Sequence, residues 1–251
     1  MPSLNVHRSI TEAAIAKLGV ELQKEFSSGL LEGVADPDKV PDRELKPRVT
    51  ARGRVRTYVG YAKHHGPSRN LVEYYFNLSL YHLRRGDGFK AGFMLGRALH
   101  YVQDGALSRR RYFVLDVHDR EEEVMKELAK SPQHVEETCR TVNVSGKRGS
   151  SRAAEALCIA LRESVDLLTR FTKESNKPVD VSELKRRVRR IRLAKALIAS
   201  ASALLTAVSP SLTALTLPII CITLLFRPKT YYEAMRAGLM LLRPIGVKPA
   251  Y

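Results

Sequence analysis

Tryptophan is absent from this chain, and cysteine occurs only at Cys139, Cys158 and Cys221. An odd number of cysteines with no CxxC pair argues against a disulfide framework and against a thiolate zinc site. The first seven residues are too polar to form the apolar core of a signal peptide. Together these absences predict a reducing, cytoplasmic setting for the protein.

Strand-like patterns are also missing. No stretch keeps the alternation of apolar and polar residues that a half-buried strand needs, and the chain has no internal repeat. Apolar residues instead recur three and four positions apart, which predicts an all-α fold. Asparagine and glutamine are scarce while arginine is abundant, a composition that leans towards a thermophilic source.

Positive charge is the dominant feature of the composition. The chain carries a formal net charge of +16 and has a sequence pI of about 10.0, while 44% of its residues are hydrophobic, enough for a core. Such a balance predicts an anionic partner, which could be nucleic acid, a phosphate ester or an anionic membrane surface.

The helices can be placed from periodicity and turn residues. Ser9 and Glu12 have the spacing of a capping box, which predicts a first helix from this point to about Leu31. Residues 39–56 contain prolines and glycine without a clear period, and they are predicted to form a loop. Further helices are predicted over residues 69–85, 89–107, 116–130 and 152–174, with a polar linker over 143–151.

The composition changes near residue 175, which predicts a helical domain over residues 1–175 and a separate segment over 176–251. In that segment, a basic stretch is followed by a run without any charge from Ala196 to Phe226. As one straight helix this run would measure ~46 Å, more than a bilayer hydrocarbon core of ~30 Å. Ser209-Pro-Ser211 splits the run and Pro218 kinks its second half, so an apolar helical hairpin is predicted.

Three environments for this apolar run remain open from the sequence: a membrane hairpin, a single kinked membrane span, or two helices buried in a soluble core. Basic residues flank both ends of the run. They favour a hairpin with both ends on the cytoplasmic side, and a single span would still leave the N-terminal domain there. Membrane association on the cytoplasmic side is therefore the prediction, with the soluble helical pair as the alternative.

Two pairs of residues, each a histidine and a carboxylate four positions apart, are candidate metal ligands. His100 and Asp104 stand four residues apart, and so do His118 and Glu122. On a helix such residues share a face, with Cβ atoms about 5–6 Å apart. Imidazole nitrogen and carboxylate oxygen are usual zinc ligands, so each pair could bind a divalent metal ion. A single pair of this kind is more often a surface pair than a metal site.

Other candidate ligands occur at helix ends and turns. His7 lies near the N-terminus, His64 and His65 precede a proline, and Asp36 and Asp38 flank a proline. Each of these alone fits a solvated cap or an ordinary turn. Only the whole ordered set points to a metal centre.

This ordered set resembles the zinc-dependent phospholipase C family, which shares its all-α fold with the S1/P1 nucleases. The specific part is Leu95-Gly-Arg-Ala-Leu-His-Tyr-Val-Gln-Asp104, which resembles the family's G-x-A-x-H-Y-x-x-D helix. The rest matches by order and residue type over about residues 5–125. The resemblance implies a multi-helix bundle of the phospholipase C/P1 nuclease type that binds one to three Zn²⁺ ions. The ligands it implies are His7, Asp38, His64 or His65, His100, Asp104, His118 and Glu122.

The resemblance also implies roles in substrate handling. Asp38, which follows the proline as in the family pattern, would be the catalytic residue that orients the attacking water. Arg109, Arg110 and Arg111 could bind the substrate phosphate by bidentate contacts, although a solvated basic turn is the simpler interpretation of these residues.

The chain departs from the family pattern in three respects. Arg110 occupies the position of a further ligand histidine. The zinc at His118 and Glu122 would therefore lose a ligand and bind more weakly, or Asp116 or Asp119 would have to replace that ligand. The N-terminal tryptophan whose amine and carbonyl bind zinc in relatives is missing. Those relatives are typically secreted, whereas no signal peptide is predicted here.

The function implied by the resemblance is that of a phospholipase C-like, zinc-dependent phosphodiester hydrolase acting at or near a membrane surface, with phospholipid as the favoured substrate. Two alternatives remain. One is a single-strand nuclease of the same fold, which the charge favours but the aromatic content of only 7% does not. The other is a degenerate, non-enzymatic protein that binds nucleic acid, the ribosome or a membrane through its basic surface.

Overall fold

A computed structural model describes residues 4–19, 22–49, 54–61, 69–108, 124–145, 152–209, 211, 213–243 and 247–250. The chain divides into two compact units, one of residues Met1–Lys177 with Arg243–Tyr251 and the other of residues Pro178–Leu242. Most of the described residues are helical, which confirms the all-α class.

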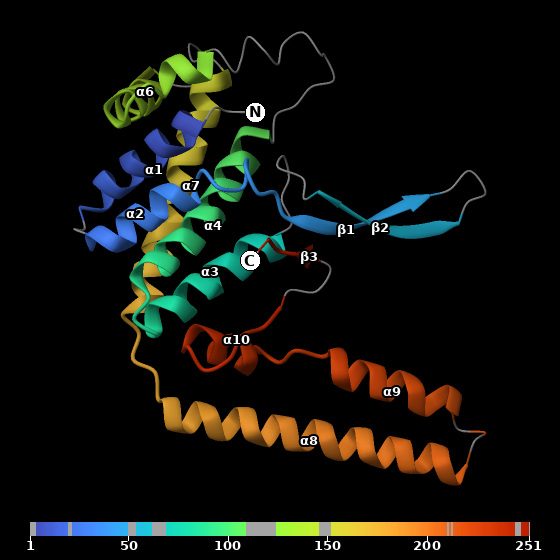
Figure 1. Ribbon diagram of the computed structural model, residues 1–251. Helices are drawn as coiled ribbons and strands as arrows, with labels where there is room; N and C mark the ends of the chain where they lie inside the picture. Colours follow the sequence, from blue (N-terminus) through green and yellow to red (C-terminus); the bar gives the residue numbers. More distant parts are fainter. Residues whose placement is uncertain are drawn as a thin grey trace. The chain divides into compact units, whose positions relative to one another are not determined.

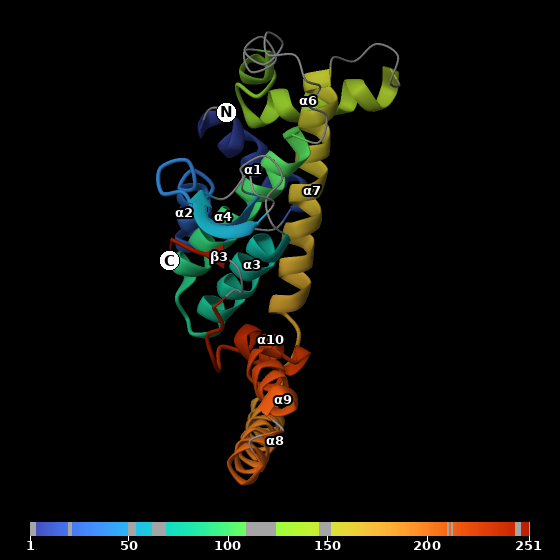
Figure 2. The ribbon, with the colours of Figure 1, turned by 90° about the vertical axis from the view of Figure 1, so that its right-hand side faces the viewer.

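The first unit is a bundle built around one central helix, α4, which contacts α2, α3 and α7 (Figure 1). The long helix α7 also contacts α1, and α6 lies across one end of α7 (Figure 2). These helices are α1 (Leu4–Leu18), α2 (Lys24–Gly33), α3 (Arg69–Arg84), α4 (Gly88–Ser108), α6 (Pro132–Ser145) and α7 (Arg152–Ser175). The predicted helices over 69–85, 89–107 and 152–174 are thereby confirmed.

Helix α4 is buried on nearly every side, as expected of a helix that is apolar around most of its circumference. Four polar residues in its middle and second half are therefore buried as well. They are Arg97, His100, Gln103 and Asp104. Buried polar groups need partners, so these four residues indicate where the function of the helix lies.

Helices α2 and α4 approach so closely that only glycine fits between them. A Cβ on Gly96 would lie 2.6 Å from the backbone nitrogen of Val34, and a Cβ on Gly33 would lie 2.7 Å from the carbonyl carbon of Phe93. Gly29 and Gly92 repeat this contact one turn earlier in their helices. The close contact holds the C-terminal end of α2, and the turn that follows it, against the middle of α4.

The start of the chain differs from the prediction. Ser9 lies inside α1, which already begins at Leu4, so the capping box at Ser9 and Glu12 was a wrong assignment. The predicted continuous helix to Leu31 is also wrong, because Gly19 adopts a left-handed backbone with φ of 59° and ends α1. A separate helix, α2, begins at Lys24.

A β-hairpin replaces the loop predicted over residues 39–56. Strands β1 (Arg43–Val49) and β2 (Val55–Tyr61) pair antiparallel, and β3 (Val247–Lys248) pairs with the start of β1, giving the order β2-β1-β3. The prediction that the chain has no strands was wrong because β2 is exposed along almost its whole length. A strand without a buried face needs no apolar–polar alternation, so the pattern that identifies strands is missing from β2.

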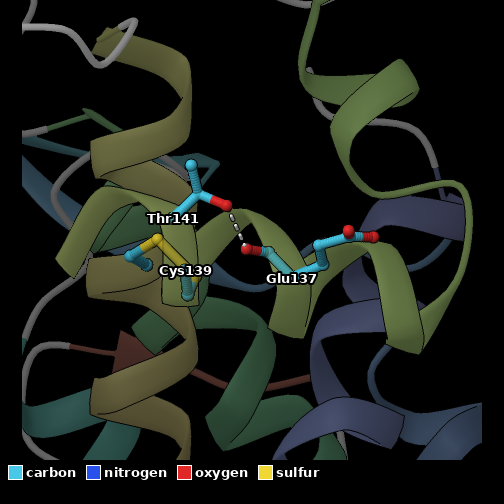
Figure 3. Close-up of a disulfide and its surroundings, with 4 residues drawn as sticks. Glu137, Cys139 and Thr141 are labelled. Atoms are coloured by element: carbon cyan, nitrogen blue, oxygen red, sulfur yellow. Dashed lines mark hydrogen bonds between the residues drawn. A yellow bond between two sulfur atoms is a disulfide. The ribbon is translucent and has the colours of Figure 1, made fainter. Parts of the chain in front are cut away.

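The structure also contains a disulfide, between Cys139 on α6 and Cys158 on α7, with the two Cα atoms 5.2 Å apart (Figure 3). The prediction against disulfides was therefore wrong for this pair. The cysteines are 19 residues apart in sequence, and packing of α6 against α7 brings them together. Disulfides are typical of oxidising compartments and, among intracellular proteins, of hyperthermophiles.

The second unit contains α8 (Val181–Val208), α9 (Thr213–Leu225) and α10 (Lys229–Arg236). Asp180 caps α8 by accepting a hydrogen bond of 2.9 Å from the backbone nitrogen of Glu183. Helix α10 packs on the first half of α8 through Leu184, Val188 and Tyr231. Helix α9 packs on the second half of α8, and by length and composition alone α8 could cross a bilayer.

Candidate metal centre

Four of the predicted ligands converge at one place in the first unit. His7 comes from α1, Asp38 from the turn after α2, and His100 and Asp104 from α4. His7 Nε2 lies 3.5 Å from Asp104 Oδ1, while His100 Nε2 lies 3.4 Å from Asp104 Oδ2 and 3.7 Å from Asp38 Oδ1. One donor atom each of His7, Asp38 and His100 lies within 4.8 Å of the other two, and Asp104 places one carboxylate oxygen near each imidazole.

Burial differs among the four residues. His7, His100 and Asp104 are buried, whereas Asp38 is exposed. The cluster is thus enclosed by the helices and meets solvent at the turn that carries Asp38. A ligand or substrate would approach from the side of this turn.

The hydrogen bonds of His100 define which nitrogen faces the cluster. Its Nδ1 lies 2.9 Å from the carbonyl oxygen of Val34. A carbonyl oxygen can only accept, so Nδ1 carries the proton. Nε2 is then the nitrogen that is directed at the carboxylates of Asp38 and Asp104. This arrangement is typical of metal-binding histidines, whose second nitrogen donates to a backbone carbonyl.

His7 is oriented by the same principle. Its Nδ1 lies 2.8 Å from Oε1 of Gln103. The amide of Gln103 is itself fixed, because its nitrogen donates to Thr11 Oγ1 at 3.0 Å and to Ser164 Oγ at 3.2 Å. The buried Nε2 of His7 has no hydrogen-bond partner among the described residues. That nitrogen faces the cluster as a free electron-pair donor.

The electrostatics favour a cation at this point. Burial, and secondly the neighbouring His100, lower the pKa of His7 from 6.5 to about 4, so its ring is neutral at pH 7. The neutral Nε2 of His7 and Asp104 Oδ1 are both acceptors, and at 3.5 Å they repel unless a cation lies between them. Ligand atoms around one tetrahedral zinc with bonds of ~2.0–2.1 Å lie ~3.3–3.4 Å apart. The three nitrogen–oxygen pairs of the cluster are 3.4–3.7 Å apart, close to this spacing.

The donor set therefore fits a divalent transition metal. Two imidazole nitrogens and two carboxylates are ligands that zinc accepts, and no thiolate takes part. His7, His100 and Asp104 are fixed by buried elements, while Asp38 supplies a ligand at the solvent side.

A second network holds the turn that carries Asp38. Arg97 on α4 donates to Asp36 and, at 2.8 Å, to Asp42 Oδ2. Tyr75 and Tyr101 donate their hydroxyl protons to Asp42 at 2.6 Å and 2.5 Å. Burial, and next the charge of Asp42, raise the pKa of both tyrosines, so the two hydroxyls keep their protons. Asp36 is thus occupied by Arg97, which leaves Asp38 to face His100.

The remaining predicted site residues lie outside the described residues. They are His64, His65, Arg109, Arg110, Arg111, His118 and Glu122. The two alternative replacements for the missing family ligand, Asp116 and Asp119, lie outside them as well.

Sequence reasoning missed the supporting residues. Gln103 and Arg97 are polar residues on an otherwise apolar helix, and each stands three positions from His100. On a helix that spacing places them beside His100, so a buried polar group at these positions was the available signal.

No family model, curated protein or solved structure matches the chain. The functional assignment therefore depends on the chemistry of this cluster and on the resemblance of the His100–Asp104 motif.

Proposed function

We propose that the protein is a zinc-dependent phosphodiester hydrolase resembling phospholipase C, acting at or near a membrane surface. The observation that carries the proposal is the convergence of His7, Asp38, His100 and Asp104, with both Nε2 atoms directed at carboxylates. These residues come from three separate elements, and the resemblance to the family implied all four as ligands.

The ligands have distinct parts in this proposal. His7 and His100 supply neutral nitrogen donors, and the Nδ1 hydrogen bonds of both rings keep Nε2 aimed at the cluster. Asp104 supplies negative charge from a buried position. Bound zinc would lower the pKa of a coordinated water towards neutrality and stabilise charge on the phosphoryl oxygens.

Asp38 is exposed, unlike the other three ligands, and we assign it a different role in the reaction. Because it is the solvent-facing carboxylate of the cluster, its Oδ1 can accept a proton from a water molecule and orient that molecule towards a phosphodiester. The net charge of +16 would attract an anionic substrate to this site. Arg97 is not a substrate ligand in this proposal, because its guanidinium is engaged by Asp36 and Asp42.

The membrane part of the proposal has separate support. Apolar side chains of α8 and α9 are exposed in the second unit. Such an apolar surface favours a lipid phosphodiester, because it would hold the enzyme at a membrane.

The test combines metal content with hydrolysis of a generic phosphodiester, bis-p-nitrophenyl phosphate. We expect purified protein to retain zinc and to hydrolyse the ester, and His100→Ala to lose both. The matched control is His134→Ala, which removes an exposed histidine on α6 and should change neither. Protein that binds no zinc and shows no hydrolysis would refute the proposal.

A further inference from the structure

The pair of helices α8 and α9 has an inverted distribution of polar and apolar side chains. Thr216 on α9 is only 5% exposed, whereas its neighbours Leu215 and Leu217 are 67% and 58% exposed. A helix pair in water would hide the leucines and expose the threonine. This pair instead presents apolar side chains outwards.

The contact between the two helices is made by small and polar residues. Thr206 Oγ1 of α8 forms a hydrogen bond with Thr216 Oγ1 of α9. Ala199 and Ser202 are half-buried on the same side of α8 as Thr206, and Thr223 is half-buried on α9. Helix pairs in lipid use small residues and interhelical hydrogen bonds in this way, because apolar burial cannot drive their association there.

Apolar exposure surrounds the pair instead of forming one patch. Leu215 and Leu217 are two residues apart, so at about 100° per residue they point to nearly opposite sides of α9, and both are exposed. On α8 the exposed apolar residues include Leu197, Leu204 and Val208. A second protein copy would cover one side of the pair, whereas a lipid phase covers all sides.

The length of the apolar part decides how it would enter a bilayer. The uncharged half of α8 runs from Ala196 to Val208, and α9 has 13 residues. At ~1.5 Å per residue each measures ~20 Å, which is shorter than a hydrocarbon core of ~30 Å. The uncharged part of neither helix reaches across the core by itself, and α9 packs back along α8, so we expect the hairpin to return to the side from which it entered.

Basic residues mark the base of the hairpin. Lys185, Arg189, Arg190 and Arg192 are exposed on the first half of α8, before the apolar half begins. Such charges strengthen binding to an anionic surface. At the boundary, Lys195 donates to the carbonyl oxygen of Phe226 and lies 5.5 Å from the ring centroid of Tyr231. Lysine and tyrosine are residues that occupy the lipid–water interface.

We propose that α8 and α9 form a re-entrant anchor that enters the hydrocarbon core of an anionic bilayer from one side, with its basic base at the headgroups and its tip, at Ser209 and Ser211, near the bilayer centre. The inference specifies how the membrane attachment in the proposed function is made. It does not depend on the metal centre.

The first test is flotation of the full chain with vesicles of phosphatidylcholine, with or without phosphatidylglycerol. We expect the wild type to float with the anionic vesicles and the double variant L204E/L215E to remain in solution, a loss of at least tenfold in the bound fraction. Both leucines are exposed, so the variant should fold. The control L45E makes the same change at an exposed position of β1 and should float like the wild type.

The second test measures the depth of the tip. A fluorophore is attached at S211C in a C221S background, since Cys221 is an exposed free cysteine. For a re-entrant hairpin, a lipid quencher at the bilayer centre should quench the probe more strongly than a quencher near the headgroups. The reverse order would overturn the proposal, whether it arose from a spanning helix or from surface binding. A soluble dimer that does not float would overturn it as well.

Failure of the anchor and failure of the hydrolase can be distinguished. His100→Ala should float like the wild type, and L204E/L215E should bind zinc like the wild type. Flotation without zinc binding would refute the hydrolase alone, and zinc binding without flotation would refute the anchor alone.

Discussion

His7 Nδ1 and Gln103 Oε1 lie 2.8 Å apart although 96 residues separate them in the chain. This hydrogen bond joins α1 to α4 in the core and holds the His7 ring with Nε2 facing Asp104. Two hydroxyl groups, of Thr11 and Ser164, fix the amide that makes it. The orientation of the first candidate ligand is therefore set by a residue that does not itself face the metal position.

Replacing Gln103 with leucine should weaken zinc binding without removing any ligand. The His7 ring would lose the acceptor for its Nδ1 proton, and losses of this kind typically reduce metal affinity 10–100-fold. Competition with a fluorescent zinc chelator would measure the change. Gln133→Leu makes the same substitution at an exposed position of α6 and should bind zinc normally. Wild-type affinity in Gln103→Leu would contradict the orienting role.

Replacing Asp104 with asparagine should stabilise the metal-free protein and at the same time abolish the stabilisation by zinc. The amide can donate to one of the two Nε2 atoms that now face a carboxylate, and it removes a buried charge. We expect the metal-free protein to gain about 1 kcal/mol in unfolding free energy, and zinc to lose its stabilising effect.

Urea unfolding with and without zinc would measure both effects. If Asp104 served as an ion-pair partner of protonated histidines, the asparagine variant would instead destabilise the metal-free protein. Asp166→Asn changes an exposed aspartate of α7 and should leave both quantities unchanged.

The metal-free protein should lose stability between pH 7 and pH 5 because of His7. Its folded pKa of about 4 lies below the value of 6.5 taken for an unperturbed ring, so the unfolded chain binds more protons in this range. The stabilising contribution is present above pH 6.5 and is lost as the pH falls towards 4. The loss from this group between pH 7 and 5 is about 2 kcal/mol.

Urea unfolding in EDTA at the two pH values would measure this loss, with His7→Asn for comparison. The variant should lose about 2 kcal/mol less than the wild type over the same range. Equal losses in the two proteins would show that His7 does not titrate as its burial implies.

Helix packing behind the site should be sensitive to a single methyl group. Gly96→Ala places a Cβ 2.6 Å from the backbone nitrogen of Val34, whose carbonyl orients His100. We expect a loss of about 1–3 kcal/mol in stability and weaker zinc binding, because α2 must move away from α4. Thermal unfolding and chelator competition would measure the two effects.

The matched control lies in the same helix. A Cβ on Gly88 would meet its nearest atom, Oε2 of Glu25, at 3.8 Å, which is an ordinary contact. Gly88→Ala should therefore change neither stability nor zinc binding appreciably. Equal effects of the two variants would contradict a specific role for the close approach.

Local periodicity predicted the helices well where one face is buried, as in α3, α4 and α7. It failed for β1 and β2, since their pairing depends on backbone hydrogen bonds while the side chains of β2 remain mostly exposed. It also failed for Cys139 and Cys158, whose proximity is a result of tertiary packing. No local pattern in the sequence contains that information.

The part of the candidate site that depends on local spacing was also predictable. The i,i+4 spacing of His100 and Asp104 follows from helix geometry, so it could be read directly. The convergence of His7 and Asp38 on that pair depends on how α1 and α2 pack, and the sequence supported it only through the resemblance. The roles of Gln103 and Arg97 depend on partners 55–96 residues away, and no spacing rule reports them.

The central claim, a zinc centre at His7, Asp38, His100 and Asp104, is tested most directly by anomalous diffraction at the zinc edge from crystals of zinc-loaded protein. We predict an anomalous peak bonded to Nε2 of both histidines and to carboxylate oxygens, at ~2.0–2.2 Å. An anomalous map with no peak between these side chains, or with zinc bound only elsewhere, would contradict the claim.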